Sequence, residues 1–216
     1  MARKRTSSDD IADIERELGA GGIEVDVYFV DGELVVIHDR TLGRTTNGSG
    51  FVMRKSFTYL RSLDAGKGEK IPTLAEVFDT VNRRALINVE LKGPRTAAPV
   101  VRLIEEYVAG RGWSYDDFQL SAFDHKQIAG VKRLQPRIPT GALIERVPRG
   151  LAAFAEKLGA ASVNPPKERV TPELVADAQK RGLKVLVFTV NEPADIARMK
   201  SLGVDGIFCD YPERCR

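Results

Sequence analysis

The 216-residue chain contains no apolar run that approaches the roughly 18 residues needed to span a bilayer, so we expect no membrane span. Its basic start, residues 1–5, leads into the polar stretch 6–10 and not into an apolar core. This pattern does not resemble a secretory signal and predicts a cytoplasmic location. The chain has few cysteines: Cys209 and Cys215 match no metal-knuckle spacing, and a reducing compartment would keep them as thiols, so we assign them no chemical role.

A strong excess of charge is also lacking. The formal net charge is +3, and the lysines and arginines are interspersed with acids instead of forming a basic stripe with aromatic residues between them. We therefore expect no nucleic-acid partner. Hydrophobic residues at 43% and charged residues at 29% are ordinary for a globular protein, and the length suits one sizeable core. The prediction is a single domain over residues 1–216.

Strand-like and helical segments alternate along almost the whole chain. The expected strands are 23–29, 34–37, 85–91, 118–121, 140–143, 162–163, 184–190 and 206–209. The expected helices are 8–18, one turn near 57–63, the segment after Thr73 to about 81, 98–109, 125–134, 150–158, 172–181 and 193–202. This alternation implies parallel strands joined by right-handed crossovers, in an open sheet or a closed barrel. Polar residues follow several strands, where a barrel gathers its active site, so we predict an α/β fold of the TIM type, a (β/α)8 barrel.

Carboxylates lie inside two of these strands. Because side chains in a strand alternate between faces, Glu24 and Asp26 share one face of their strand. The same rule places Asn88, Glu90 and Lys92 on one face of a later strand. Several buried carboxylates close together are unfavourable unless a cation joins them or some take up protons. A hard divalent metal is the simplest solution.

Six segments resemble the glycerophosphodiester phosphodiesterase family in their order and spacing. They are GIEVDV (22–27), VIHD (36–39), RTTNG (44–48), NVELK (88–92), FTVN (188–191) and GVDGI (203–207). The resemblance covers the chain from about residue 19 onward. It implies a TIM-type barrel enzyme that splits glycerophosphodiesters into glycerol 3-phosphate and an alcohol. The substrate would be a small molecule.

The resemblance also implies roles for individual residues. Glu24, Asp26 and Glu90 match the acids that hold Ca²⁺ or Mg²⁺ in the family, and Lys92 would be a second positive contact to the phosphate. The other interpretation of Lys92 is a surface lysine, which the strand alternation opposes. His38 matches one of two histidines that act as general acid and base.

Two departures from the family pattern stand out. The family's first strand, which ends in His-Arg-Gly and supplies the other histidine, has no counterpart in this sequence. Two explanations stay open: residues 2–5 are an eroded remnant of that strand, or the chain is a fragment whose start lies upstream. The barrel would then have a missing or degenerate first strand, and a second copy of the chain could pair with the strand edges left exposed. Phe188 stands where the family commonly has tryptophan. It is a wall of the substrate site or plain barrel core.

Three functions therefore remain open. The first is a metal-dependent phosphodiesterase with activity reduced by the loss of one histidine. The second is a catalytically silent barrel that binds a phosphodiester or phosphate metabolite. The third treats the acids as holders of a structural cation. His125, the only other histidine, precedes a helix and is expected to have a capping or surface role.

Overall fold

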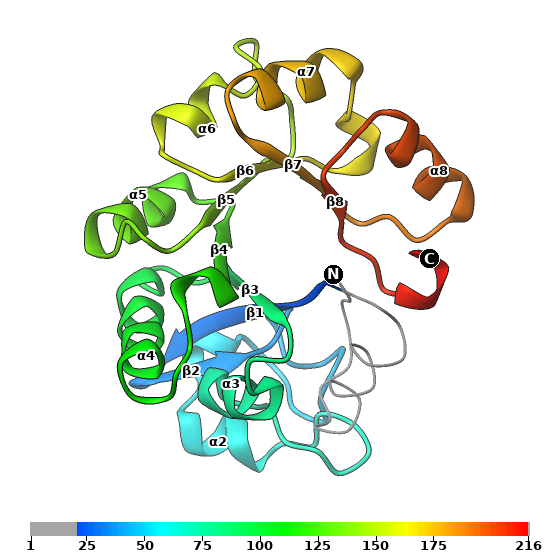
Figure 1. Cartoon of the computed structure of the whole chain (residues 1–216). Helices are drawn as coiled ribbons and strands as arrows, with labels where there is room; N and C mark the ends of the chain where they lie inside the picture. The colour runs from blue at the N-terminus through cyan, green and yellow to red at the C-terminus, as the bar shows by residue number, and fades with distance from the viewer. Residues whose placement is uncertain (1–20, 216) are drawn as a thin grey trace.

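The fold is built on one curled sheet, in a computed structural model that describes residues 21–215. Its strand order is β2-β1-β3-β4-β5-β6-β7-β8, and every neighbouring pair is parallel except β1 with β2. The strands are β1 Gly22–Val30, β2 Glu33–Val36, β3 Leu86–Leu91, β4 Phe118–Ala122, β5 Thr140–Leu143, β6 Ser162–Asn164, β7 Lys184–Val187 and β8 Gly206–Ile207. Figure 1 shows the sheet curling around a central space with the helices outside it.

The helices follow the parallel strands and cover the outer face of the sheet. They are α2 Phe57–Ser62, α3 Leu74–Val81, α4 Ala97–Gly110, α5 His125–Leu134, α6 Ala153–Lys157, α7 Pro172–Lys180 and α8 Pro193–Ser201. Between residues 21 and 215, no helix combines the length and the apolar character that crossing a bilayer requires. The expected helix at 8–18 lies outside the described residues.

The two faces of the sheet differ in chemistry. Apolar strand residues point outward and pack against the helices; Ile87 and Val89 of β3, for example, join Phe78 of α3 and Ile104 of α4 in one buried cluster. The inward face is polar and also buried. Its members are Glu24, Asp26, Asn88, Glu90, Gln119, Ser121, Ser162 and Asn164. Strand alternation thus gathers the polar groups inside the ring of strands.

The prediction of an α/β fold of the TIM-barrel type is confirmed, whereas the first strand that was predicted to be missing or degenerate lies outside the described residues. Seven parallel strands, β1 and β3 to β8, are found among residues 21–215, and within that range β8 pairs with β7 and not with β1. The hairpin of β1 and β2 is also as expected: Asp31 and Gly32, with φ of 55° and 88°, make the tight turn that a two-residue hairpin loop requires.

Some predicted boundaries were wrong at the carboxyl ends of the strands. β7 ends at Val187 and not at 190, and Phe188 adds only an isolated parallel bridge to Pro166, in the loop after β6. β8 likewise ends at Ile207 and not at 209. The helix expected over 150–158 is shortened to α6, since the chain turns at 148–151 before it.

Helix α3 begins at a capping box that fixes one edge of the barrel mouth. The Thr73 side chain accepts from the Glu76 N–H, and the Glu76 carboxylate accepts from the Thr73 N–H and from Arg61. We expect Thr73→Ala to lower the free energy of unfolding by about 1 kcal/mol. Thr73→Ser keeps the hydroxyl and should therefore retain most of the stability of the unmodified chain. Urea unfolding of both variants checks this, and equal losses would show that the hydroxyl is not the stabilising group.

Candidate metal centre and active site

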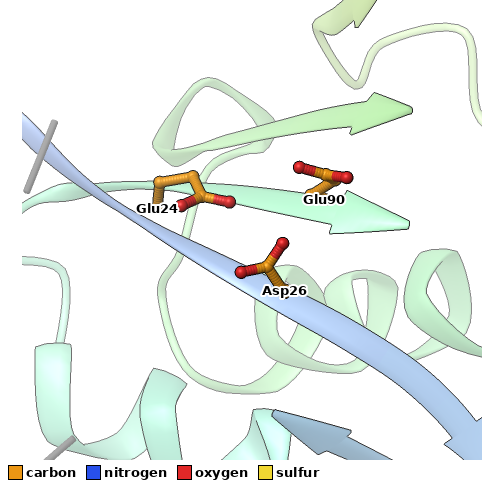
Figure 2. A group of neighbouring side chains, drawn as sticks. All are labelled: Glu24, Asp26 and Glu90. Carbon is orange, nitrogen blue, oxygen red and sulfur yellow. The ribbon is translucent and has the colours of Figure 1, made fainter. Parts of the chain in front are cut away.

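Three buried carboxylates form the candidate metal centre. Glu24 and Asp26 project from β1, and Glu90 projects from the neighbouring β3 (Figure 2). One carboxylate oxygen of each lies within 4.8 Å of the other two, and the residues are 9%, 5% and 7% exposed. The parallel register explains this convergence, since Asp26 lies directly beside Glu90 and Glu24 lies two residues earlier on the same face.

This set of donors fits a hard divalent cation. All three groups are carboxylates, and oxygen ligands are those that Ca²⁺ and Mg²⁺ prefer. Asp26 Oδ1 is buried and accepts no hydrogen bond from the part of the chain that the structure describes. One ammonium, that of Lys92, lies 3.4 Å from this oxygen, and a single ammonium does not neutralise three neighbouring carboxylates. The residues therefore suit the metal that the family resemblance implies.

Lys92 follows β3 and places its ammonium group beside these acids. Lys92 Nζ donates to Glu90 Oε1 at 2.8 Å and lies 3.4 Å from Asp26 Oδ1. Burial lowers the pKa of Lys92, but the charges of Glu90 and Asp26 outweigh burial and leave the pKa raised, so the side chain stays charged. Three carboxylates and one ammonium leave two negative charges, which one divalent cation balances.

His38 lies just beyond the end of β2 and is held by its neighbours. Its Nδ1 is 2.6 Å from Asp39 Oδ1, and Arg44 donates to both oxygens of the same carboxylate. The hydrogen bonds from Arg44, followed by that from His38, hold the pKa of Asp39 well below its usual range. An ionised carboxylate only accepts, so Nδ1 of His38 carries a proton. Nε2 is then the ring nitrogen left for substrate.

A cavity of about 940 Å³ connects the acids and the imidazole. Glu24, Asp26 and His38 line it, and its walls come from the long segment after β2 and from Asp210 after β8. This volume is of the order found for small-molecule sites. Three of the predicted site residues do not line this cavity: Glu90, Lys92 and Phe188. Of the six predicted site residues, the structure thus groups four at the acids, turns His38 toward the same space and leaves Phe188 apart.

Phe188 belongs to an aromatic pair that lies across the barrel mouth. Its ring meets that of Phe123 edge-on, with centroids 5.9 Å apart and planes at 86°. Phe188 follows β7 and Phe123 follows β4, and Phe123 is 41% exposed. Phe188 itself is half-buried, so its role as a wall of the substrate site stays a prediction.

The His125 side chain packs against other parts of the protein. Its Nε2 bonds to the Leu143 carbonyl at 2.9 Å, and its ring stacks on Phe154 with centroids 5.1 Å apart. The carbonyl is an acceptor, so Nε2 carries a proton and faces the protein. The capping or surface role expected for His125 was wrong, because Asp124 caps α5 and the half-buried His125 ring packs against Phe154; His125 does not replace the second family histidine.

Three residues at or near the site were missed by the sequence analysis. Asp39 and Arg44 orient His38, but neither received a role, although both stand in the segments that carry the resemblance. The sequence alone does not indicate that Asp39 contacts His38, because the side chains of adjacent residues usually point in different directions. The Arg44 to Asp39 pairing depends on the fold of the loop between them. Phe123 was missed for a similar reason, because its partner comes from a distant strand.

Known proteins resemble this chain over nearly its whole length. The sequence pattern of the Glycerophosphoryl diester phosphodiesterase family matches residues 16–214. A glycerophosphodiester phosphodiesterase from Caldanaerobacter subterraneus subsp. tengcongensis is 37% identical, with 97% of this chain and 91% of that protein covered. A glycerophosphodiester phosphodiesterase from Bacillus subtilis is 30% identical, with 92% and 76% covered.

A solved structure gives the same result for the fold. The structure of an Oleispira antarctica phosphodiesterase in complex with the product sn-glycerol-3-phosphate superposes with a TM-score of 0.84 at 28% identity, covering 95% of this chain and 88% of that one. Sequence and structure agree over the same span of residues. The chain belongs to the glycerophosphoryl diester phosphodiesterase family.

Proposed function

We propose that the chain is a metal-dependent phosphodiesterase that hydrolyses glycerophosphodiesters to glycerol 3-phosphate and an alcohol. The observation that carries the proposal is the convergence of three buried carboxylates, two of which, Glu24 and Asp26, line a cavity that His38 also lines. Family membership supports the reaction, and the product bound by the Oleispira antarctica enzyme supports the substrate class.

The acids would hold a cation, and Lys92 would contact the phosphate directly. Glu24, Asp26 and Glu90 would hold a Ca²⁺ or Mg²⁺ ion, which when bound supplies positive charge to the phosphoryl oxygens. The Lys92 ammonium lies beside Glu90 and Asp26, so it can contact a phosphate oxygen placed against them. Positive charge held in place before the reaction is the main requirement for cleaving a dianion-like transition state.

His38 moves the proton at the reacting hydroxyl. With Nδ1 donating to Asp39, Nε2 would accept a proton from an attacking hydroxyl or donate one to a leaving oxygen, but not serve both sides at once. Asp39 stabilises the imidazolium that forms, and Arg44 fixes Asp39. The aromatic pair of Phe188 and Phe123 offers an apolar surface for the carbon part of the substrate.

Binding with slow turnover is the second candidate, and one observation favours it. His125 is bonded to the Leu143 carbonyl, so residues 21–215 offer His38 as their one imidazole for proton transfer. General acid–base assistance contributes roughly 10² to 10⁴ in rate. A chain that supplies half of the family's proton relay would bind a phosphodiester well and cleave it slowly.

Release of glycerol 3-phosphate from glycerophosphocholine tests both candidates. Protein treated with chelator is assayed without metal and with Ca²⁺ or Mg²⁺, and substrate binding is measured in parallel by calorimetry. Metal-dependent release supports the enzyme. Metal-dependent binding without release supports the second candidate. Absence of both leaves only a structural role for the acids.

Several sequence predictions concern properties beyond the site. A single domain over 1–216, a cytoplasmic location, the absence of a nucleic-acid partner and self-association across the edges of β1 and β8 all stay predictions. Mass measurement in solution checks the last of these, since a strict monomer contradicts filling of the open edge by a second copy.

A further inference from the structure

The three acids occupy three corners of a square on the inner face of the barrel, and Asn88 occupies the fourth. In the register of β1 and β3, Glu24 lies beside Asn88 and Asp26 lies beside Glu90. Neighbouring parallel strands are about 4.8 Å apart, and residues two apart along a strand are separated by roughly 6.6 Å. A cation placed among the three carboxylates therefore lies next to the Asn88 side chain as well.

One oxygen of Asn88 is left without a partner. Asn88 is 1% exposed, its Nδ2 donates to Ser121 Oγ at 2.9 Å, and its Oδ1 accepts no hydrogen bond from any described residue. Ser121 belongs to β4, on the far side of β3 from β1. Because the two polar atoms of an amide diverge, Oδ1 is turned away from β4 and toward the strand that carries Glu24.

The diagonally opposite corner of the square differs from that of Asn88. Asp26 Oδ1 is also buried without a hydrogen bond from the described residues, but the Lys92 ammonium lies 3.4 Å from it. No described residue donates a hydrogen bond to Asn88 Oδ1, and a buried polar atom without a partner points to an electropositive group beside it. The hydrogen bond to Ser121 orients the Asn88 amide.

We propose that Asn88 Oδ1 is a fourth protein oxygen of the cation site and that Ser121 is the residue that positions it. This inference rests on the proposed metal dependence. Amide carbonyl oxygens are common ligands of Ca²⁺ and are compatible with Mg²⁺. A neutral ligand is suited to this corner, because the three acids and Lys92 already leave the two negative charges that a divalent cation balances.

Calorimetric titration of chelator-treated protein with Ca²⁺ and with Mg²⁺ tests this. Asn88→Ala is expected to weaken cation binding about tenfold or more, as loss of an orienting or ligating group does. Asn88→Asp, which keeps an oxygen at this corner, should restore binding. Ser121→Ala should give a smaller loss, because the amide remains but is no longer oriented.

Gln119→Ala is the matched control. Gln119 lies beside Asn88 on β4, is likewise a buried amide, and donates to Ser162 on the side away from the acids. It should leave cation affinity unchanged. Equal losses in Asn88→Ala and Gln119→Ala, or unchanged affinity in Asn88→Ala, would overturn the inference.

Thermal unfolding without metal shows whether each variant folds. A cation-induced rise in melting temperature then gives a second measure of binding that does not depend on turnover. If the wild-type chain binds neither cation, the proposed metal dependence itself fails. If the wild type binds and Asn88→Ala binds equally, only the role of Asn88 fails.

Discussion

Asp26→Asn is expected to abolish cation-dependent turnover and, at the same time, to stabilise the cation-free protein. Asp26 lies at the centre of the site, with Glu90 beside it, Glu24 on the same face and Lys92 3.4 Å from its Oδ1. The substitution keeps the shape of the side chain and removes one charge. Losing one of three charged ligands should lower the rate by about 10³ or more, since removal of even one charge-stabilising donor costs roughly 10² to 10³.

The same charges predict that Asp26→Asn raises the stability of the cation-free protein. Without a cation, the Asp26 carboxylate is repelled by two others that lie within 4.8 Å and is attracted by one ammonium that already bonds to Glu90 at 2.8 Å. Removing it relieves more repulsion than attraction. A gain of about 1 kcal/mol would raise the melting temperature by about 2–4 °C in a chain of this size.

Asp79→Asn is the matched control for both measurements. Asp79 is exposed on α3, where it pairs with Arg111 and Tyr107 and not with any of the three acids. It should change neither turnover nor cation affinity. If Asp26→Asn retains cation-dependent activity, or if it lowers the melting temperature of the cation-free protein as a lost structural contact would, the acids do not form a metal centre.

The convergence of the acids could be predicted because two simple rules combine. Alternation fixes the face of Glu24, Asp26 and Glu90, and parallel pairing of consecutive strands brings those faces together. Neither rule depends on loop conformation. The barrel was predictable for the same reason, since the alternation of apolar and polar residues in each strand specifies its outer and inner faces.

The remaining parts of the site depend on contacts that no local pattern encodes. The Arg44 to Asp39 pairing requires a particular loop, and the Phe123 to Phe188 contact joins β4 to β7, which are not neighbours in the sheet. The early end of β7 has a similar origin, because Phe188 bonds to a loop backbone and not to the next strand. Asn88 lies on the predicted face of β3. That its Oδ1 lacks a hydrogen bond from the described residues could not be predicted, because this depends on the contact between its Nδ2 and Ser121 of β4.

His38→Ala is expected to lower kcat by about 10² to 10⁴ while leaving cation affinity unchanged, because His38 contacts Asp39 and lines the cavity but is not one of the grouped acids. Asp39→Asn should lower kcat as well, since it removes the anion that fixes the proton on Nδ1.

The two histidines of the chain make a matched pair for this experiment. His125→Ala removes the bond to the Leu143 carbonyl and the stack on Phe154, so it should lower the melting temperature and spare kcat. His38→Ala should do the reverse, because the His38 side chain is 40% exposed and contributes little packing. Steady-state kinetics and thermal unfolding of both variants separate the two roles. Comparable losses of kcat in the two variants would mean that His38 acts through the fold and that proton transfer relies on another group.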